Sequence, residues 1–411
     1  MILVKMGSRN IWRNKKRTIL TVAAIAFAVM VLEFFFSIQV KSYGAAVDAS
    51  VAVFHGHLQI QVEGYNDSPE IRSTIPNALE LKAKLKEDLD IEEISTRSIS
   101  FGLLASESRS YGAQVVGVEP DSEGDVSNIP GLIKEGKFVN SSDYLGAALG
   151  ATLAKNLQVQ VGDEVTLMSQ GLDGSLVATI LTVSGIFESG STEVDRNIVE
   201  ISLKDFDEQF EMYGGAHAIV VDTANVEDAE ILSQKIKSKL TEYGLKKLVV
   251  LDWEELLPGL KQTINLDMSA GWLFYLSLIL IVTFSILNTF LMSVLERTKE
   301  FGVLLSLGMK SVSISKLISY EAIILICLGV VLGNVFGALV VSYYHEYGFV
   351  APGAEEIMKK WNLPNRIFPD ITFQSFFYPS ITVFLVSLLS IIYPAVKVLR
   401  LEPLKALQGE H

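Results

Sequence analysis

The strongest constraint on this chain comes from two long apolar runs that contain no charged residue. Met268–Leu295 spans 28 residues without Asp, Glu, Lys or Arg, and Ala322–Tyr344 spans 23. A helix needs about 20 apolar residues to cross a hydrocarbon core about 30 Å thick. Ile19–Val40 and Phe376–Val398 are two further apolar segments of sufficient length. The sequence therefore predicts four membrane spans, and the segment between the second and third must lie at a membrane surface.

The charges divide unevenly between the two sides of the membrane. Residues 1–18, residues 295–316 and the tail from Lys397 together hold 13 basic and four acidic residues. Residues 41–270 hold 18 basic and 37 acidic residues. Because basic segments remain inside, both termini and residues 295–316 are predicted to be cytoplasmic. The acidity of the long segment argues against nucleic acid as a partner.

The predicted fold class is a membrane protein with four transmembrane α-helices, one plus three, and a large mixed α/β periplasmic domain inserted between helices 1 and 2. The expected parts are 1–18, a cytoplasmic basic segment; 19–40, the first span; 41–270, the periplasmic domain; 271–294, the second span; 295–316, the cytoplasmic coupling region; 317–344, the third span; 345–375, a periplasmic loop; 376–398, the fourth span; and 399–411, the cytoplasmic tail. We call residues 295–316 the joint.

Alternating and helical patterns predict the elements of the 41–270 domain. The expected elements are strands at 57–65, 217–223 and 245–251, helices at 77–89 and 226–243, and a hairpin within 164–187 that turns at Gly171 and Asp173-Gly174. The strand, helix and strand from 217 to 251 are expected to form a small subdomain. Gly162, Gly185 and Gly190 are expected to permit tight backbone turns.

The joint is predicted to form a short helix along the membrane face. Leu295–Leu307 contains few helix breakers, and Gly308 stands where a left-handed C-terminal cap would end the helix. On one continuous helix, Glu296 and Glu300 are four residues apart and share a face. This like-charge pair is unfavourable unless a basic group receives it, so we expect a basic surface there.

Several strings of residues resemble one family. They are ERTKEFGVLLSLGM and ISKLISYEA at the joint, a span with Gly329, Gly333 and Gly337, VQVGDEVTLMS and VSGIFESGSTEVDRN in the outer domain, and YPAVKVLRLEPLKAL in the tail. They are similar to FtsX/MacB-type ABC transporter permeases, the superfamily that includes the LolC and LolE lipoprotein-releasing permeases. The resemblance implies that the joint docks on an ATPase and that Glu321 faces the coupling helix. It assigns ATPase coupling to Glu296, Arg297, Glu300, Phe301, Gly302 and Gly308.

The resemblance also implies the partners. Two copies of a cytoplasmic ABC ATPase subunit would bind ATP and Mg. The permease would pair with a second copy or a paralogue and transmit ATP-driven closure through spans one and two. Lipoprotein or another exported cargo, a periplasmic carrier or adaptor, and membrane lipids complete the expected set. The expected location is the bacterial inner membrane, as a multi-pass protein.

An acid and three aromatic residues in the first span are candidates for a substrate or cavity site. An acid inside a span is costly where it meets lipid, so Glu33 is expected to face other helices, a cavity or the headgroup region. Phe34, Phe35 and Phe36 follow it directly. They could contact cargo, or they could be the aromatic residues that any lipid-facing helix end carries.

No cofactor, metal site or catalytic residue is predicted in the chain itself. Gly131, Gly136 and Lys137 match the start of a P-loop, but Phe138 stands where the motif needs a Ser or Thr for Mg. The spacing of His55 and His57 alone is a weak indication of a metal site. Cys327 is the single cysteine, so no disulfide within the chain can form.

The substrate stays open at the level of sequence. Lipoprotein release fits the length, the four spans and the absence of a fused ATPase. A MacB-like exporter or tripartite efflux permease is the first alternative. The second is an FtsX-like signalling permease that activates a periplasmic cell-wall hydrolase and moves no substrate.

Overall fold

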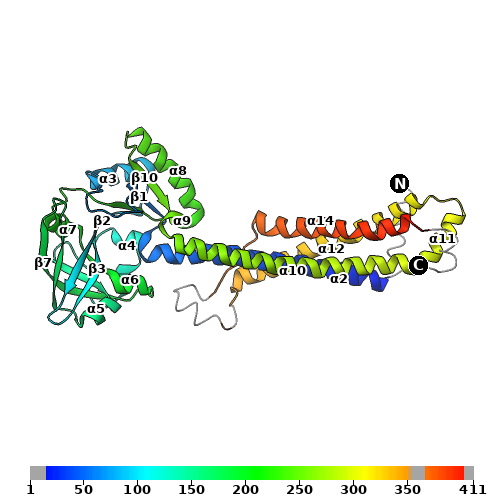
Figure 1. The fold of residues 1–411 in the computed structure, drawn as a ribbon, viewed down its shortest axis with the longest axis horizontal. Coiled ribbons are helices and arrows are strands. Elements are labelled where there is room, and N and C mark those ends of the chain that lie inside the picture. Colours follow the sequence, from blue (N-terminus) through cyan, green and yellow to red (C-terminus); the bar gives the residue numbers. More distant parts are fainter. Residues whose placement is uncertain (1–14, 351–352, 354–365, 402–411) are drawn as a thin grey trace. The chain divides into compact units, whose positions relative to one another are not determined.

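The computed structural model describes residues 15–350, 353 and 366–401, and the chain divides into two compact units (Figure 1). The helical unit comprises residues 1–43, 264–351 and 366–411. The α/β unit comprises residues 44–263 and 352–365.

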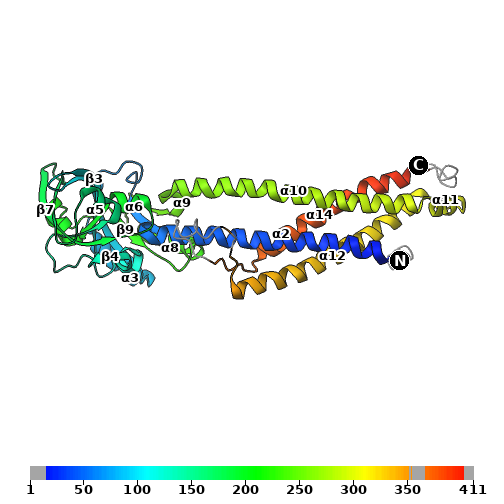
Figure 2. The ribbon, with the colours of Figure 1, turned by 90° about the horizontal axis from the view of Figure 1, so that it is seen from below.

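The helical unit contains four helices that are long and apolar enough to cross a membrane. They are α2 (Lys15–Ser50), α10 (Pro258–Glu296), α12 (Ser311–Tyr347) and α14 (Phe373–Leu399). They lie side by side in both views (Figures 1 and 2) and share one apolar core, which includes Ile25, Val29, Ile286, Leu325 and Val383. The short helix α11 (Thr298–Ser306) lies at the same end of this unit as the first described turn of α2 and the last turn of α14. The predicted set of four helical spans is confirmed.

Three glycines let α12 approach α2 closely. A Cβ atom added to Gly333 would lie 2.6 Å from the Cβ of Val29, and one added to Gly329 would collide with α2 in the same way. Gly337 continues the four-residue repeat and faces Glu33. Small residues at this spacing allow close helix packing in lipid, where no hydrophobic effect draws helices together.

The α/β unit is built on a ten-stranded sheet. Its strands are β1 (Leu58–Val62), β2 (Ile94–Ala105), β3 (Ser110–Val118), β4 (Ile133–Gly136), β5 (Gly146–Gly150), β6 (Glu164–Gln170), β7 (Leu176–Phe187), β8 (Ile198–Ser202), β9 (Ala218–Val221) and β10 (Leu248–Asp252). The helices are α3 (Ala78–Leu89), α4 (Glu123–Val126), α5 (Ala151–Leu157), α6 (Thr192–Asn197), α7 (Leu203–Phe210), α8 (Val226–Glu242) and α9 (Trp253–Leu256). The strand order is β10-β1-β9-β2-β3-β8-β5-β7-β4, with β6 paired to both β2 and β7.

These pairings define two lobes. Strands β10, β1, β9 and the first half of β2 pair antiparallel, and with α3 and α8 they form a split β-α-β arrangement that we call the split lobe. Strands β2, β3, β8, β5, β7 and β6 pair in a closed ring, which we call the ring lobe. All six strands of the ring contribute to one buried apolar cluster. The ring therefore encloses a core of its own.

The strands, helices and hairpin predicted from the sequence are present, with two corrections to the predictions for this unit. The segment from β9 through α8 to β10 is no separate subdomain, because β1 pairs with both strands and lies between them. Gly185 is not in a turn but within β7, where the backbone of Lys137 approaches so closely that a side chain would collide with it. Gly162 and Gly190 have positive φ angles of 96° and 80°, as the predicted turns require.

Candidate functional site

The joint contains two helices where the sequence predicted one. Helix α10 ends at Glu296 and α11 begins at Thr298, because the backbone breaks at Arg297, with φ −102° and ψ 8°. Glu296 and Glu300 therefore belong to different helices, and the prediction that they share one helical face is wrong. The spacing of the two acids was correct, but the helix between them is interrupted.

Arg297 lies inside the joint and holds its helices together. It is 8% exposed, and its Nη1 donates to Oε2 of Glu321 on α12 over 2.8 Å. Its Nε donates to Oε2 of Glu300 over 3.2 Å. The guanidinium carbon lies 5.1 Å from the ring centre of Phe301. Arg297 thus supplies a basic partner to Glu300, and the predicted proximity of Glu321 to the coupling helix is seen in the structure.

Three of the six residues assigned to ATPase coupling point inward. Phe301 is completely buried in a small core with Val294, Ile314 and Val398, and Gly302 and Arg297 are buried beside it. These residues are buried and so are not available as a contact surface in this structure; they pack within the joint. Gly308 is exposed and has a φ of 90°, which confirms the predicted left-handed geometry at the end of the coupling helix.

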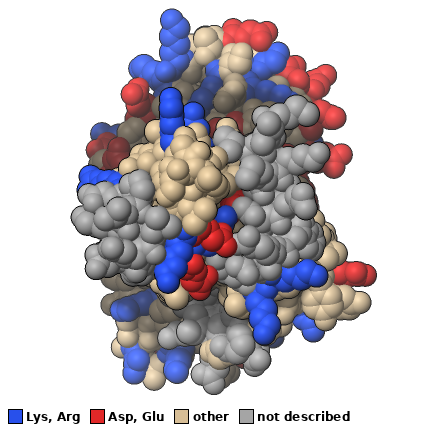
Figure 3. All heavy atoms as spheres, turned by 90° about the vertical axis from the view of Figure 1, so that its right-hand side faces the viewer, with Lys and Arg blue, Asp and Glu red and all other residues tan. Residues whose placement is uncertain are grey.

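The exposed surface of the joint carries apolar, basic and acidic side chains. Its exposed apolar and basic residues, which we call the docking face, are Lys299, Val303, Leu307, Lys310, Val312 and Lys316, and the acids Glu296 and Glu300 are exposed beside them. Leu307 is 79% exposed, and Val303 and Val312 are also largely exposed, so the docking face carries three apolar side chains that this chain leaves uncovered. Figure 3 looks at this end, where uncharged surface lies among Lys and Arg side chains and next to acidic ones. The apolar members were missed from the sequence, although Val303 on α11 and its C-cap residue Leu307 are four residues apart.

The far part of α2 carries the acid predicted to face other helices. Glu33 is 1% exposed and packs against Gly337 of α12. Its two carboxyl oxygens have no hydrogen-bond partner among the described residues. Of the predicted environments for Glu33, the structure shows the one in which it faces another helix.

The three phenylalanines after Glu33 point in three directions. Phe34 packs against Tyr344 and Phe349, and Phe36 packs against Tyr275 and Tyr378. Phe35 packs against Phe274 and Tyr275 of α10 and is 36% exposed, more than either neighbour. Of the three, Phe35 is therefore the best placed to meet a molecule from outside the chain.

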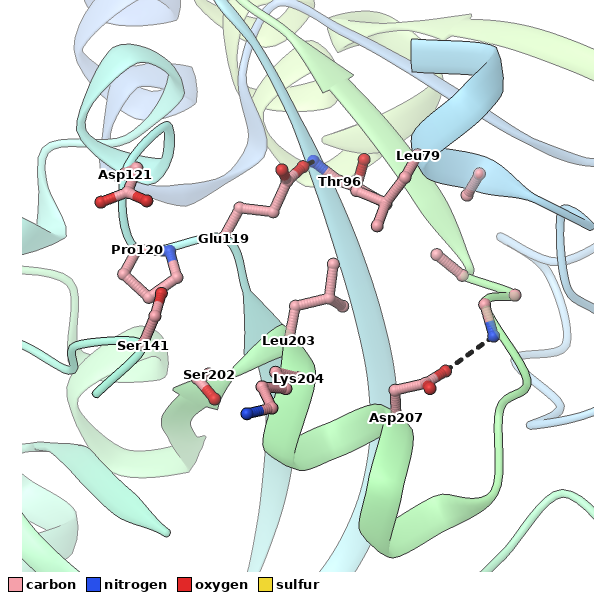
Figure 4. A pocket seen from close by; sticks show the side chains of 14 residues that line it. Leu79, Thr96, Glu119, Pro120, Asp121, Ser141, Ser202, Leu203, Lys204 and Asp207 are labelled. Carbon is pink, nitrogen blue, oxygen red and sulfur yellow. Dashed lines mark hydrogen bonds between the residues drawn. The ribbon is translucent and has the colours of Figure 1, made fainter. Parts of the chain in front are cut away.

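The α/β unit has a pocket between its two lobes (Figure 4). Glu119 and Asp207 point toward it from the end of β3 and from α7. Glu119 accepts hydrogen bonds from the backbone N of Thr96 over 2.8 Å and from Lys82 over 2.7 Å, while Asp207 accepts from the backbone N of Gly214 over 2.8 Å. Because the chain itself uses both carboxylates, we assign no ligand to this pocket.

The P-loop match has no phosphate-binding geometry. Its residues form a short 3-10 helix (Ile129–Leu132) followed by strand β4, and Lys137 comes directly after that strand. A P-loop instead wraps phosphate with the turn that precedes a long helix. In the described ranges, no three His, Cys, Asp or Glu side chains cluster closely enough to hold a metal ion.

His57 is engaged by two carboxylates. Its Nδ1 lies 2.5 Å from Oδ1 of Asp222, which follows β9, and its Nε2 lies 3.2 Å from Oδ1 of Asp48 in the last turn of α2. Burial alone would lower the pKa of His57, but the hydrogen bonds and charges of the two aspartates outweigh burial and raise the pKa from 6.5 to about 9. The imidazolium therefore ties the end of α2 to the sheet.

This contact predicts a defined pH dependence. Because the folded-state pKa is raised, the stability contributed by His57 is complete below pH 6.5 and is lost as the pH rises through about 9. We expect the difference in unfolding free energy between the wild type and His57→Gln to shrink over this interval, measured by thermal unfolding in detergent. His217 is a matched control, because burial lowers its pKa to about 4 and it stays neutral throughout. A His57→Gln difference that does not vary with pH would contradict the assignment.

Comparison with known proteins matches both units. Residues 272–403 match the family model described as FtsX-like permease C-terminal, and residues 18–239 match the model described as MacB-like periplasmic core domain. The second match alone covers more than half of the chain.

Individual relatives are distant. The lipoprotein-releasing system transmembrane protein LolC of Xylella fastidiosa is 22% identical over 315 residues, which cover 74% of this chain and 74% of that protein. The macrolide export ATP-binding/permease protein MacB of Rhodospirillum rubrum is 28% identical over 285 residues, which cover 67% of this chain and 40% of that protein. The crystal structure of the periplasmic region of MacB from Actinobacillus actinomycetemcomitans aligns with a TM-score of 0.36 and 16% identity, over 52% of this chain and 94% of that chain.

Proposed function

This chain belongs to the family of FtsX-like ABC transporter permeases with a MacB-like periplasmic core domain, and we propose that it couples ATP hydrolysis by a separate cytoplasmic ATPase to conformational change of its periplasmic domain. The observation that carries the proposal is the docking face. An exposed leucine and two exposed valines among lysines are the kind of surface that a protein partner covers. Under this proposal, ATP and Mg would be held by the ATPase subunits.

The buried residues of the joint support a transmission of movement from α11 to the membrane helices, and not merely the attachment of an ATPase at α11. Arg297 connects α11 to α12 through Glu321, so a push on α11 reaches the base of α12 without an intervening flexible segment. Helix α12 in turn packs on α2 through its glycines. A force applied at the docking face thus has a packed route through the helical unit.

We further propose that the cargo is a lipoprotein released from the inner membrane. Support comes from relatives named lipoprotein-releasing system transmembrane proteins, which match about three quarters of the chain. Burying each methylene contributes about 0.8 kcal/mol, so transferring two long acyl chains into water would cost on the order of 20 kcal/mol. An apolar route beside the helices avoids this cost. Export of another cargo is the second candidate, since the MacB relative is 28% identical over 67% of this chain.

A photo-crosslinking residue at Phe35 distinguishes these cargoes. Its ring is partly exposed, and its contacts with Phe274 and Tyr275 lie where α2 meets α10. We expect adducts with lipoproteins in cells, detected by mass spectrometry. The same residue at Phe27, which is 62% exposed on α2, is the control and should yield phospholipid adducts. Adducts of position 35 with soluble peptide or drug, or with phospholipid alone, would move the assignment to the exporter.

A further inference from the structure

The last turns of helix α2, from Gly44 onward, belong to the α/β unit and are bound within it residue by residue. After Ser50 the helix widens into a π-helical segment, η2 (Val51–His55), before the chain enters β1. The last carbonyl groups of a helix lack partners within the helix, so other groups must satisfy them. Here the carbonyl of Ala52 accepts from the backbone N of Asn128 over 2.8 Å, and that of Val53 accepts from Oγ of Ser127 over 3.1 Å.

The next carbonyl is held by a buried charge. The carbonyl of Phe54 accepts a hydrogen bond from Nη1 of Arg97, on strand β2, and the guanidinium carbon lies 4.5 Å from the centre of the Phe54 ring. Arg97 is completely buried, and it donates from Nε, over 3.1 Å, and from Nη2 to the carboxylate of Glu123 on α4. We call Arg97, Glu123, Ser127 and Asn128 the α2 socket.

A second buried acid, Glu200, interacts with the charges of Arg97 and Glu123. Glu200 on β8 is completely buried, and its carboxyl oxygens have no hydrogen-bond partner in the described part of the chain. Burial raises the pKa of Glu200 well above its usual range, and the charge of Glu123 raises it further, whereas Arg97 opposes the shift. Burial also raises the pKa of Glu123, but Arg97 opposes that shift through its charge and its hydrogen bonds. Arg97 therefore forms its ion pair with Glu123 and makes no hydrogen bond with Glu200.

The socket is expensive to build, which argues that it serves a purpose beyond stability. Burying an arginine and a glutamate costs about as much as their attraction returns, and an apolar substitute of similar volume is often equally stable. Besides its hydrogen bonds to Glu123, Arg97 donates one more hydrogen bond, to the carbonyl of Phe54 just beyond the end of α2. An apolar residue could fill the same volume but could not bind the carbonyl of Phe54.

We propose that the α2 socket is the fixed connection through which movement of α2 is transmitted to the strands of the α/β unit. Arg97 is the positioning residue of this connection. This inference rests on the proposed coupling function. A helix end attached by a flexible linker would swivel and lose the movement. Three successive carbonyls are bound and Asp48 is held by His57, so residues 48–54 cannot turn within the α/β unit without breaking several hydrogen bonds at once.

The test uses the double variant Arg97→Met/Glu123→Gln, which removes the buried pair together and leaves no unpaired charge. Hydrogen exchange followed by mass spectrometry, on the full chain in nanodiscs, reports the socket directly. We expect amides in residues 44–57 to exchange about tenfold faster or more, the ratio that corresponds to about 1.4 kcal/mol of local opening. Exchange in β6 and β7 should not change, which shows that the unit remains folded. Glu200→Gln is the matched control and should behave like the wild type.

The coupling part of the proposal is read in the complex with the ATPase. The double variant should hydrolyse ATP at the wild-type rate but lose the ATP-dependent change in hydrogen exchange of the ring lobe. Unchanged hydrogen exchange in residues 44–57 of the variant would overturn the proposal that the α2 socket fixes the end of α2. A full ATP-dependent response of the variant would overturn it as well. If the wild type itself shows no ATP-dependent response, the proposed function fails instead, and the exchange result on the socket is unaffected.

Discussion

The variant Leu307→Glu is expected to lose the ATPase subunit while its membrane helices remain folded. Leu307 is 79% exposed at the end of α11 and makes little contribution to the core of the joint. Burying a leucine against a partner contributes about 1.5–3 kcal/mol, so its loss should weaken binding roughly tenfold to a hundredfold, and a buried unpaired carboxylate would add to this. Co-purification of the ATPase and ATP hydrolysis by the reconstituted complex measure both effects.

Leu176→Glu provides a closely matched control for that experiment. Leu176 lies on β7 of the α/β unit and is 78% exposed, so the two substitutions change the same chemistry at the same exposure. It should leave the ATPase bound and active. If Leu307→Glu binds the ATPase as well as Leu176→Glu does, the docking face is solvent-exposed surface and not an interface.

The variant Arg297→Met is expected to cost up to about 3–5 kcal/mol of stability at the joint. Removing one member of a buried ion pair weakens the compensation of the other charge, and this loss is costly in a buried site. Here Glu321, which is 6% exposed, would lose the guanidinium that donates to it over 2.8 Å. We expect a lower unfolding temperature in detergent and fast proteolysis within α11.

The double variant Arg297→Met/Glu321→Gln separates charge from volume. It removes both charges while keeping side chains of similar length, so most of the lost stability should return. Coupling should not return with it, because α11 no longer has a charged connection to α12. If the single variant is as stable as the wild type, Arg297 does not hold the joint and its burial has another cause.

Much of the fold follows from local patterns in the sequence. Helix α8 was placed at 226–243 and is observed at Val226–Glu242, because its apolar residues recur with helical spacing. The hairpin of β6 and β7 follows from alternation on both sides of a turn in which Gly174 has a φ of 92°. The left-handed geometry of Gly308 follows from the ending of the helical pattern there. Each of these features depends on residues that are neighbours in the sequence.

The features that were missed or wrong depend on residues far apart in the sequence. Arg97 stands in the string ISTRSISF, in which no local pattern marks a buried charge, and the contacts of Arg97 with η2 and α4 form only in the folded chain. The break at Arg297 is similar, since no Gly or Pro marks it. The side chain of Arg297 binds Glu321, which is 24 residues further along the chain. A pattern of local spacing contains no information about either partner.

The ring lobe has a consequence for how such permeases can diversify. The chain leaves the split lobe along β2 and returns to it along β9, and at that point Arg97 and Ala218 pair directly across the two strands. Entry and exit thus lie side by side, as they do where one domain has been inserted into another. The socket residues Glu123, Ser127 and Asn128 lie within the inserted segment, between β3 and β4. A lineage could therefore enlarge, shrink or exchange the part of the ring that follows β4 without moving the split lobe, provided that this stretch is kept. Recognition of new cargo could then evolve in that part of the ring while the α2 socket is inherited unchanged.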